Sequence, residues 1–154
     1  MTHESPLEAL LSTRLAADAS APRLTIETDS SSDDLALAIA QAADDRKGGD
    51  IVLLKVADVS YLADYFVLVT GFSHVQVRAI ANSIEQTVKE KLQRVPVRIE
   101  GQAEGNWVLI DYGDVIAHIF LEKDREFYNL EAFWGHAERL SFAALQGAST
   151  SAKG

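Results

Sequence analysis

Two apolar runs separated by a short turn constrain this chain more than any other feature. Residues 107–110 and 115–121 are almost wholly apolar, and the four residues between them read Asp-Tyr-Gly-Asp. Glycine suits the positive φ angles of tight hairpin turns, although tyrosine is unusual beside it. The pattern therefore predicts an antiparallel hairpin with a two-residue loop at Tyr112-Gly113.

Side chains alternate between the two faces of this hairpin. In the predicted register, Asp111 lies opposite Asp114 and Trp107 lies opposite His118. One face is wholly apolar and is predicted to be core: Val108, Ile110, Val115, Ala117, Ile119 and Leu121. The other face mixes aromatic, aliphatic and acidic side chains: Trp107, Leu109, Asp111, Asp114, Ile116, His118 and Phe120. The mixture is typical of a protein-binding surface, and an open alternative is that a helix covers it while the Asp pair shapes the turn.

Periodicity and capping signals predict the remaining elements. In order, these are a helix over 31–47, strands over 51–56 and 65–70, a helix over 73–92, a strand over 96–100, the hairpin, and a final helix. The final helix is expected to direct Phe127, Leu130 and Trp134 toward the core, because their spacing is three and four residues. This order predicts an α/β (α+β) fold with a single mixed five-stranded sheet and helices packed on it.

Composition suggests one domain over residues 33–140. Residues 1–32 and 141–154 are rich in Ser, Ala and Thr and are expected to be disordered tails. The chain has no cysteine, which excludes disulfides and thiolate metal sites and fits a cytoplasmic protein. It also lacks a recognisable secretory signal and any run of about 18 apolar residues.

Charge narrows the class of partner. The net charge is −9, and residues 99–140 carry nine acidic residues against three basic ones. Such a chain is unsuited to general nucleic-acid binding, which requires clustered Lys and Arg. A basic partner would be steered toward the acidic region around the hairpin.

Motifs for catalysis are sparse. The four histidines form no HExxH frame, and neither a GxxxxGK[ST] loop nor a GxGxxG loop is present. Ser73 fits a helix cap better than a nucleophile. Asp111 and Asp114 would repel each other across a tight turn, and a cation such as Mg²⁺ or a partner's Lys or Arg would relieve that repulsion. A metal-dependent nucleotidyltransferase-like enzyme using these two acids is therefore the alternative, although residues 96–100 lack the second acidic motif that such enzymes need.

Five segments in the same order resemble the ribosomal silencing factors, the RsfS or Iojap family. They are Ala42-Ala43-Asp44-Asp45, residues 63–67, residues 70–76, residues 107–118, and residues 125–131 with Trp134. Phe72 and Ala117 are conservative departures from the family pattern. The resemblance covers residues 35 to about 135.

The resemblance implies a nucleotidyltransferase-like topology without catalytic motifs, and a protein that is not an enzyme and needs no cofactor or metal. Members bind ribosomal protein L-fourteen on the large ribosomal subunit, block subunit association and damp translation during nutrient limitation or stationary phase. Free members are often dimers, and direct nucleic-acid binding is not required. The family pattern marks six partner-binding candidates: Trp107, Asp111, Tyr112, Asp114, His118 and Tyr128.

Overall fold

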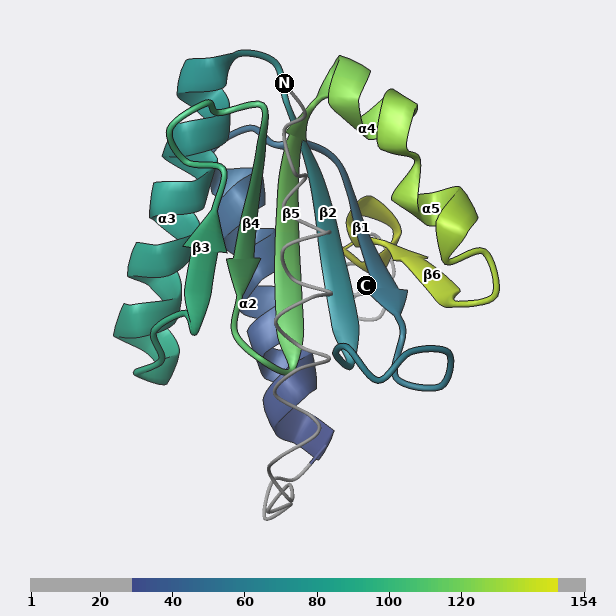
Figure 1. Cartoon of the computed structure of the whole chain (residues 1–154). Coiled ribbons are helices and arrows are strands. Elements are labelled where there is room, and N and C mark those ends of the chain that lie inside the picture. The colour runs from purple at the N-terminus through teal and green to yellow at the C-terminus, as the bar shows by residue number, and fades with distance from the viewer. Residues whose placement is uncertain (1–28, 147–154) are drawn as a thin grey trace.

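The architecture is one mixed sheet with two long helices on one face (Figure 1). The structure, a computed structural model, describes residues 29–146. Its strands are β1 (Gly49–Lys55), β2 (Tyr65–Gly71), β3 (Arg98–Glu100), β4 (Trp107–Asp111), β5 (Val115–Leu121) and β6 (Glu138–Ser141). Its helices are α2 (Asp29–Asp45), α3 (His74–Leu92), α4 (Glu122–Tyr128) and α5 (Leu130–Phe133).

The strand order is β3-β4-β5-β2-β1-β6, and only the central β2–β5 pair is parallel. The predicted α/β class with one mixed sheet is therefore confirmed. The predicted strand number of five is wrong, because β6 pairs with the outer edge of β1. This strand has only one apolar residue, Leu140, among its four positions, so its sequence carries a weak strand signal.

The first core lies between the sheet and helices α2 and α3. It contains the apolar stripe of each helix and the hairpin residues predicted to be core, among them Val108, Ile110 and Ala117. The predicted start of α3 is also confirmed, because the Ser73 hydroxyl accepts the Gln76 backbone N–H at 3.0 Å. Helix α3 ends at Gln93, whose φ of 54° places it in the left-handed region.

The hairpin register differs from the prediction by two residues. Trp107 pairs with Phe120 and Asp111 pairs with Ile116, so the connection comprises the three residues 112–114 rather than two. A shift of two preserves the side-chain alternation, whereas a shift of one would have exchanged the faces. The predicted division of the hairpin into two faces therefore survives the error in register.

The segment after β5 is two short helices and not one. Asn129 adopts a left-handed φ of 46°, which ends α4 and begins α5. Leu130 is buried and Trp134 packs against the second face of the sheet, as expected. Phe127 was predicted to be core, but it is 80% exposed because the break at Asn129 removes it from the common helical stripe.

Two described features lie just outside the predicted domain of residues 33–140. Helix α2 begins at Asp29, and Phe142 packs in the first core beyond the end of β6. Most of the two predicted tails, residues 1–28 and 147–154, lies outside the described residues. Within residues 29–146, none of the helices is sufficiently long and apolar to cross a membrane.

Candidate functional site

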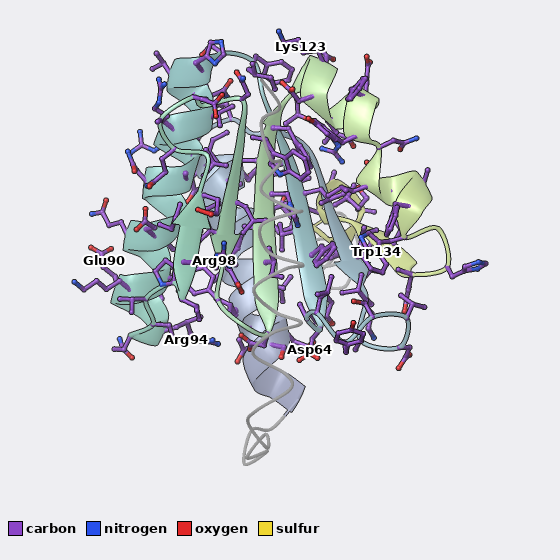
Figure 2. The ribbon with its side chains drawn as sticks, viewed as in Figure 1. Asp64, Glu90, Arg94, Arg98, Lys123 and Trp134 are labelled. Carbon is purple, nitrogen blue, oxygen red and sulfur yellow. The ribbon has the colours of Figure 1, made fainter. Side chains whose placement is uncertain are left out.

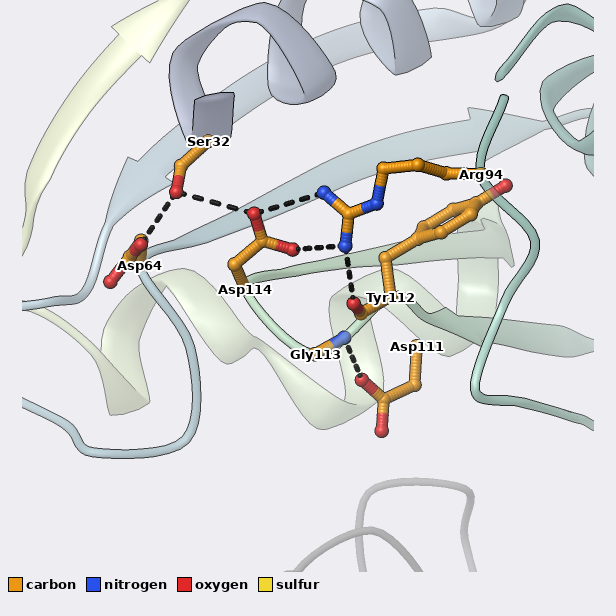
Figure 3. A network of polar contacts seen from close by, with 7 residues as sticks. All are labelled: Ser32, Asp64, Arg94, Asp111, Tyr112, Gly113 and Asp114. Carbon is orange, nitrogen blue, oxygen red and sulfur yellow. Dashed lines mark hydrogen bonds and ion pairs between the residues drawn. The ribbon is translucent and has the colours of Figure 1, made fainter. Parts of the chain in front are cut away.

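Arg94 closes the turn of the hairpin from the end of α3. Its guanidinium donates to both carboxylate oxygens of Asp114, at 2.8 and 3.1 Å, and to the Tyr112 carbonyl at 2.8 Å (Figure 3). A two-point arginine–carboxylate contact fixes orientation as well as charge. The predicted need for a cation beside Asp114 is therefore met within the chain by Arg94.

The same turn is tied to the start of α2. Ser32 donates its hydroxyl to Asp64 at 2.6 Å and lies 3.3 Å from the Asp114 carboxylate. The Asp64 backbone N–H donates to the Asp114 carbonyl at 2.7 Å. Figure 2 shows Asp64 and Arg94 at the same end of the molecule. Segments from α2, the β1–β2 connection, α3 and the hairpin thus meet in one polar network.

Asp111 and Asp114 do not form the pair that the two-residue turn predicted. Asp111 is buried and accepts the Gly113 backbone N–H at 2.7 Å, and its side chain points away from Asp114 in Figure 3. Among the described residues, no three His, Cys, Asp or Glu side chains gather as metal ligands. The arrangement is that of a stabilised turn, in which each carboxylate holds backbone or guanidinium donors.

The second face of the hairpin forms an aromatic cluster with neighbouring elements, comprising Phe66, Trp107, His118, Phe120, Tyr128 and Trp134. Trp107 donates its indole N–H to Nδ1 of His118 at 3.1 Å. The Tyr128 ring, from the end of α4, lies 4.7 Å from the Trp107 ring between centroids. Trp134, labelled in Figure 2, reaches from the end of α5 to Phe66.

The predicted exposure of this face is wrong. Trp107 is 4% exposed and His118 is fully buried, so the alternative of a covered face is closer to the structure. Burial lowers the pKa of His118 to about 3, and the ring is therefore neutral at pH 7. Its Nε2 atom has no hydrogen-bond partner among the described residues, and the same is true of Nε1 of Trp134.

The six candidates thus fall into three groups. Asp111 and Tyr112 are buried at the turn, where burial raises the pKa of the Tyr112 hydroxyl above its ordinary value. Trp107 and His118 are buried in the aromatic cluster. Asp114 is partly exposed within the Arg94 network, and Tyr128 is exposed at the surface of the cluster.

Sequence reasoning missed the buried centre at Arg125. This side chain is 7% exposed, although it lies in the strongly polar run of residues 122–126. It donates to the Asp50 carbonyl at 2.6 Å, to the Thr70 hydroxyl at 2.9 Å and to Glu131 at 2.8 Å. The Arg125–Glu131 ion pair, with side chains 7% and 15% exposed, therefore joins α4 and α5 to strands β1 and β2.

Comparison of the sequence with known protein families identifies the family of this chain. Residues 29–153 match the sequence model described as "Ribosomal silencing factor during starvation". The chain belongs to the ribosomal silencing factor family. The resemblance of its five ordered segments to that family is thereby confirmed.

Individual ribosomal silencing factors show the extent of the similarity. The ribosomal silencing factor RsfS of Bacillus subtilis strain 168 is 43% identical over 98 residues, which are 64% of this chain and 82% of that protein. The chloroplastic Iojap protein of Arabidopsis thaliana is 36% identical over 124 residues, 80% of this chain and 51% of the relative. A crystal structure from Chromobacterium violaceum, 37% identical, superposes with a TM-score of 0.63 over 71% of this chain and 88% of that one.

Proposed function

We propose that this member of the ribosomal silencing factor family binds ribosomal protein L-fourteen on the large ribosomal subunit. Bound there, it sterically blocks the small subunit and represses translation during nutrient limitation or stationary phase. It acts in the cytoplasm, without catalysis or a cofactor and with no requirement for direct nucleic-acid contact, and it forms dimers when free. The observation that carries the proposal is the family match over residues 29–153.

The aromatic cluster supports a docking role for its exposed edge. Tyr128 is 42% exposed while its ring rests on the buried Trp107, so the partner meets an aromatic side chain held from behind. Rigid aromatic anchors of this kind carry much of the binding energy in protein interfaces. In this proposal Tyr128 contacts the partner directly, whereas Trp107 and His118 hold Tyr128 and the strand beneath it in position.

The turn network has a supporting role in the same proposal. Asp111, Tyr112 and Asp114 fix the hairpin turn through contacts to Gly113 and Arg94, which keeps β4 and β5 in register. A steric blocker needs a rigid shape more than reactive groups, because its effect comes from occupying a surface. A fixed hairpin beneath the docking edge supplies that rigidity.

Sedimentation with purified ribosomal subunits tests the proposal. The wild-type chain is expected to co-sediment with large subunits and to lower the fraction of joined ribosomes. The Tyr128→Ala variant is expected to bind about tenfold more weakly, as for loss of an aromatic anchor. The control is Tyr61→Ala, since Tyr61 is a 63% exposed tyrosine in the β1–β2 connection and is not one of the cluster residues.

Three results would contradict the proposal at different levels. A wild-type chain that neither co-sediments with large subunits nor lowers subunit joining removes the function itself. Binding to large subunits that is not competed by isolated L-fourteen assigns a different partner on the subunit. Equal binding by the Tyr128→Ala and Tyr61→Ala variants removes Tyr128 from the interface.

A further inference from the structure

A polar pocket opens at the carboxyl ends of the two parallel strands β2 and β5. Thr70 and Phe72 contribute from the end of β2, and Glu122, Arg125 and Glu126 contribute from α4 after β5. This edge is where α/β sheets commonly place ligand sites, because connections diverge there. The pocket is separate from the hairpin turn, which lies at the opposite end of β5.

The positive charge of Arg125 at the floor of the pocket is already paired within the chain. Arg125 directs its donors to the Asp50 carbonyl, the Thr70 hydroxyl and the Glu131 carboxylate, at 2.6 to 2.9 Å. Glu131 also lies 3.7 Å from Arg139. An anion entering the pocket would have to displace these buried bonds, which makes Arg125 a structural centre and not an anion receptor.

The rim carries two acids without internal partners. Glu122 and Glu126 are exposed, and neither forms an ion pair or side-chain hydrogen bond with another residue in the part that the structure describes. They are four residues apart on α4 and therefore lie on one side of it, where like charges destabilise the helix slightly. A cation placed between them relieves this repulsion.

The exposed aromatic ring of Phe72 lines the same pocket as these two acids. Phe72 is 62% exposed, and its ring lies over Gly49 so closely that a Cβ there would be 2.8 Å from a ring carbon. The Phe72 backbone N–H donates to the side chain of Gln76 at 2.8 Å, and Gln76 in turn donates to two carbonyls of the α2–β1 connection at 3.1 Å. These hydrogen bonds anchor the Phe72 backbone, and Gly49 contacts one part of the ring, while the rest of the ring is exposed.

We propose that this pocket binds an arginine side chain of a basic protein partner, with the guanidinium between Glu122 and Glu126 and stacked against Phe72. Guanidinium is planar, pairs with carboxylates at two points and stacks on aromatic rings, so it uses all three groups at once. A bare metal ion would leave the ring unused. The inference rests on the proposed function in taking the partner to be the ribosomal one.

Binding to large subunits at several salt concentrations tests the pocket. The variant Glu122→Gln with Glu126→Gln is expected to bind about tenfold more weakly and to show a shallower dependence of affinity on salt. The control is Asp58→Asn with Glu90→Gln, which removes the same charge from exposed positions elsewhere. Figure 2 shows Glu90 far from Lys123 of α4. Phe72→Leu, which keeps an apolar side chain without the aromatic ring, is expected to weaken binding as well.

A titration with a hexa-arginine peptide separates this inference from the proposed function. Amide NMR shifts at Phe72, Glu122 and Glu126 are expected to move with the peptide in the wild-type chain and to stay unchanged in the double variant. If the wild-type chain shows these NMR shifts but does not bind ribosomes, the proposed function is wrong and the arginine pocket is supported. If the shifts are absent, or if the pocket and control variants bind ribosomes equally well, the proposal that the pocket binds arginine is wrong.

Discussion

Trp107 and His118 form a hydrogen-bonded pair inside the aromatic cluster, with the indole N–H of Trp107 donating to Nδ1 of His118 at 3.1 Å. Because Nδ1 accepts this bond, the proton of the neutral imidazole is on Nε2. The two residues belong to adjacent strands, and Leu109 rather than Trp107 is the partner of His118 in the strand register. The bond therefore runs diagonally across β4 and β5 and links two successive positions of one face.

This pair predicts a pH dependence of stability. In the folded chain burial lowers the pKa of His118 to about 3, whereas in the unfolded chain it is near the ordinary value of about 6.5. The unfolded state therefore binds the proton first as the pH falls, and the free energy of unfolding decreases between about pH 6.5 and pH 3. Between pH 7 and pH 5 the expected loss from His118 is about 2 kcal/mol.

Urea denaturation of the wild-type chain and of His118→Gln at both pH values measures this loss. Glutamine keeps an acceptor for the Trp107 indole and does not titrate, so the variant should lose less stability on acidification. Carboxylates and the other histidines titrate in both proteins and cancel in the difference. Parallel losses in the two proteins would show that His118 is not buried in the neutral form.

Trp107→Ala is expected to destabilise the fold. Trp107 is buried among Phe120, Tyr128 and His118, and removing a buried tryptophan costs about 3–5 kcal/mol. Chemical denaturation measures the change, with Phe127→Ala as the control because Phe127 is exposed and adjacent in sequence to Tyr128. The control should change stability by about 0.5 kcal/mol or less. A folded, equally stable Trp107→Ala protein would restore the sequence-based interpretation of Trp107 as a surface residue.

The ion pair between Arg94 and Asp114 is expected to couple α3 to the hairpin turn. Arg94→Ala and Asp114→Asn should each destabilise the chain, and a double-mutant cycle should give a coupling free energy of about 1 kcal/mol. The value is modest because both side chains are partly exposed, at 32% and 26%.

The surface pair Lys55–Glu138 provides the matched comparison for that cycle. Its charged atoms are 3.9 Å apart and its side chains are about half exposed or more, so its coupling should be near zero. Equal coupling in the two cycles would mean that Arg94 does not hold the turn.

Local patterns predicted most of the framework. Alternation assigned Val108 and Ile110 to the first core, and the Ser73 cap located the start of α3. The predicted two-residue loop was wrong because Tyr-Gly fits a tight turn poorly. In the three-residue connection, Arg94 donates hydrogen bonds to Asp114 and to the Tyr112 carbonyl. That contact spans about twenty residues of sequence, and nothing within the hairpin itself indicates it.

The site was harder to predict for the same reason. Whether the second face of the hairpin is exposed depends on where the chain goes after β5, and residue spacing does not give that path. Asn129 did carry a usable signal, because asparagine tolerates the left-handed conformation that separates α4 from α5. Arg125 carried none, since a charged run ordinarily indicates a solvated surface and its burial depends on Asp50, Thr70 and Glu131 together.

The pairing of β6 with β1 has a consequence for synthesis of the chain. Val52 pairs with Ser141, so one edge of β1 acquires its neighbour only after nearly all of the domain has been translated. Until then the edge of an apolar strand is open to pairing with other nascent chains. Truncation before Glu138 is therefore expected to leave this edge open and to increase aggregation of the newly made protein.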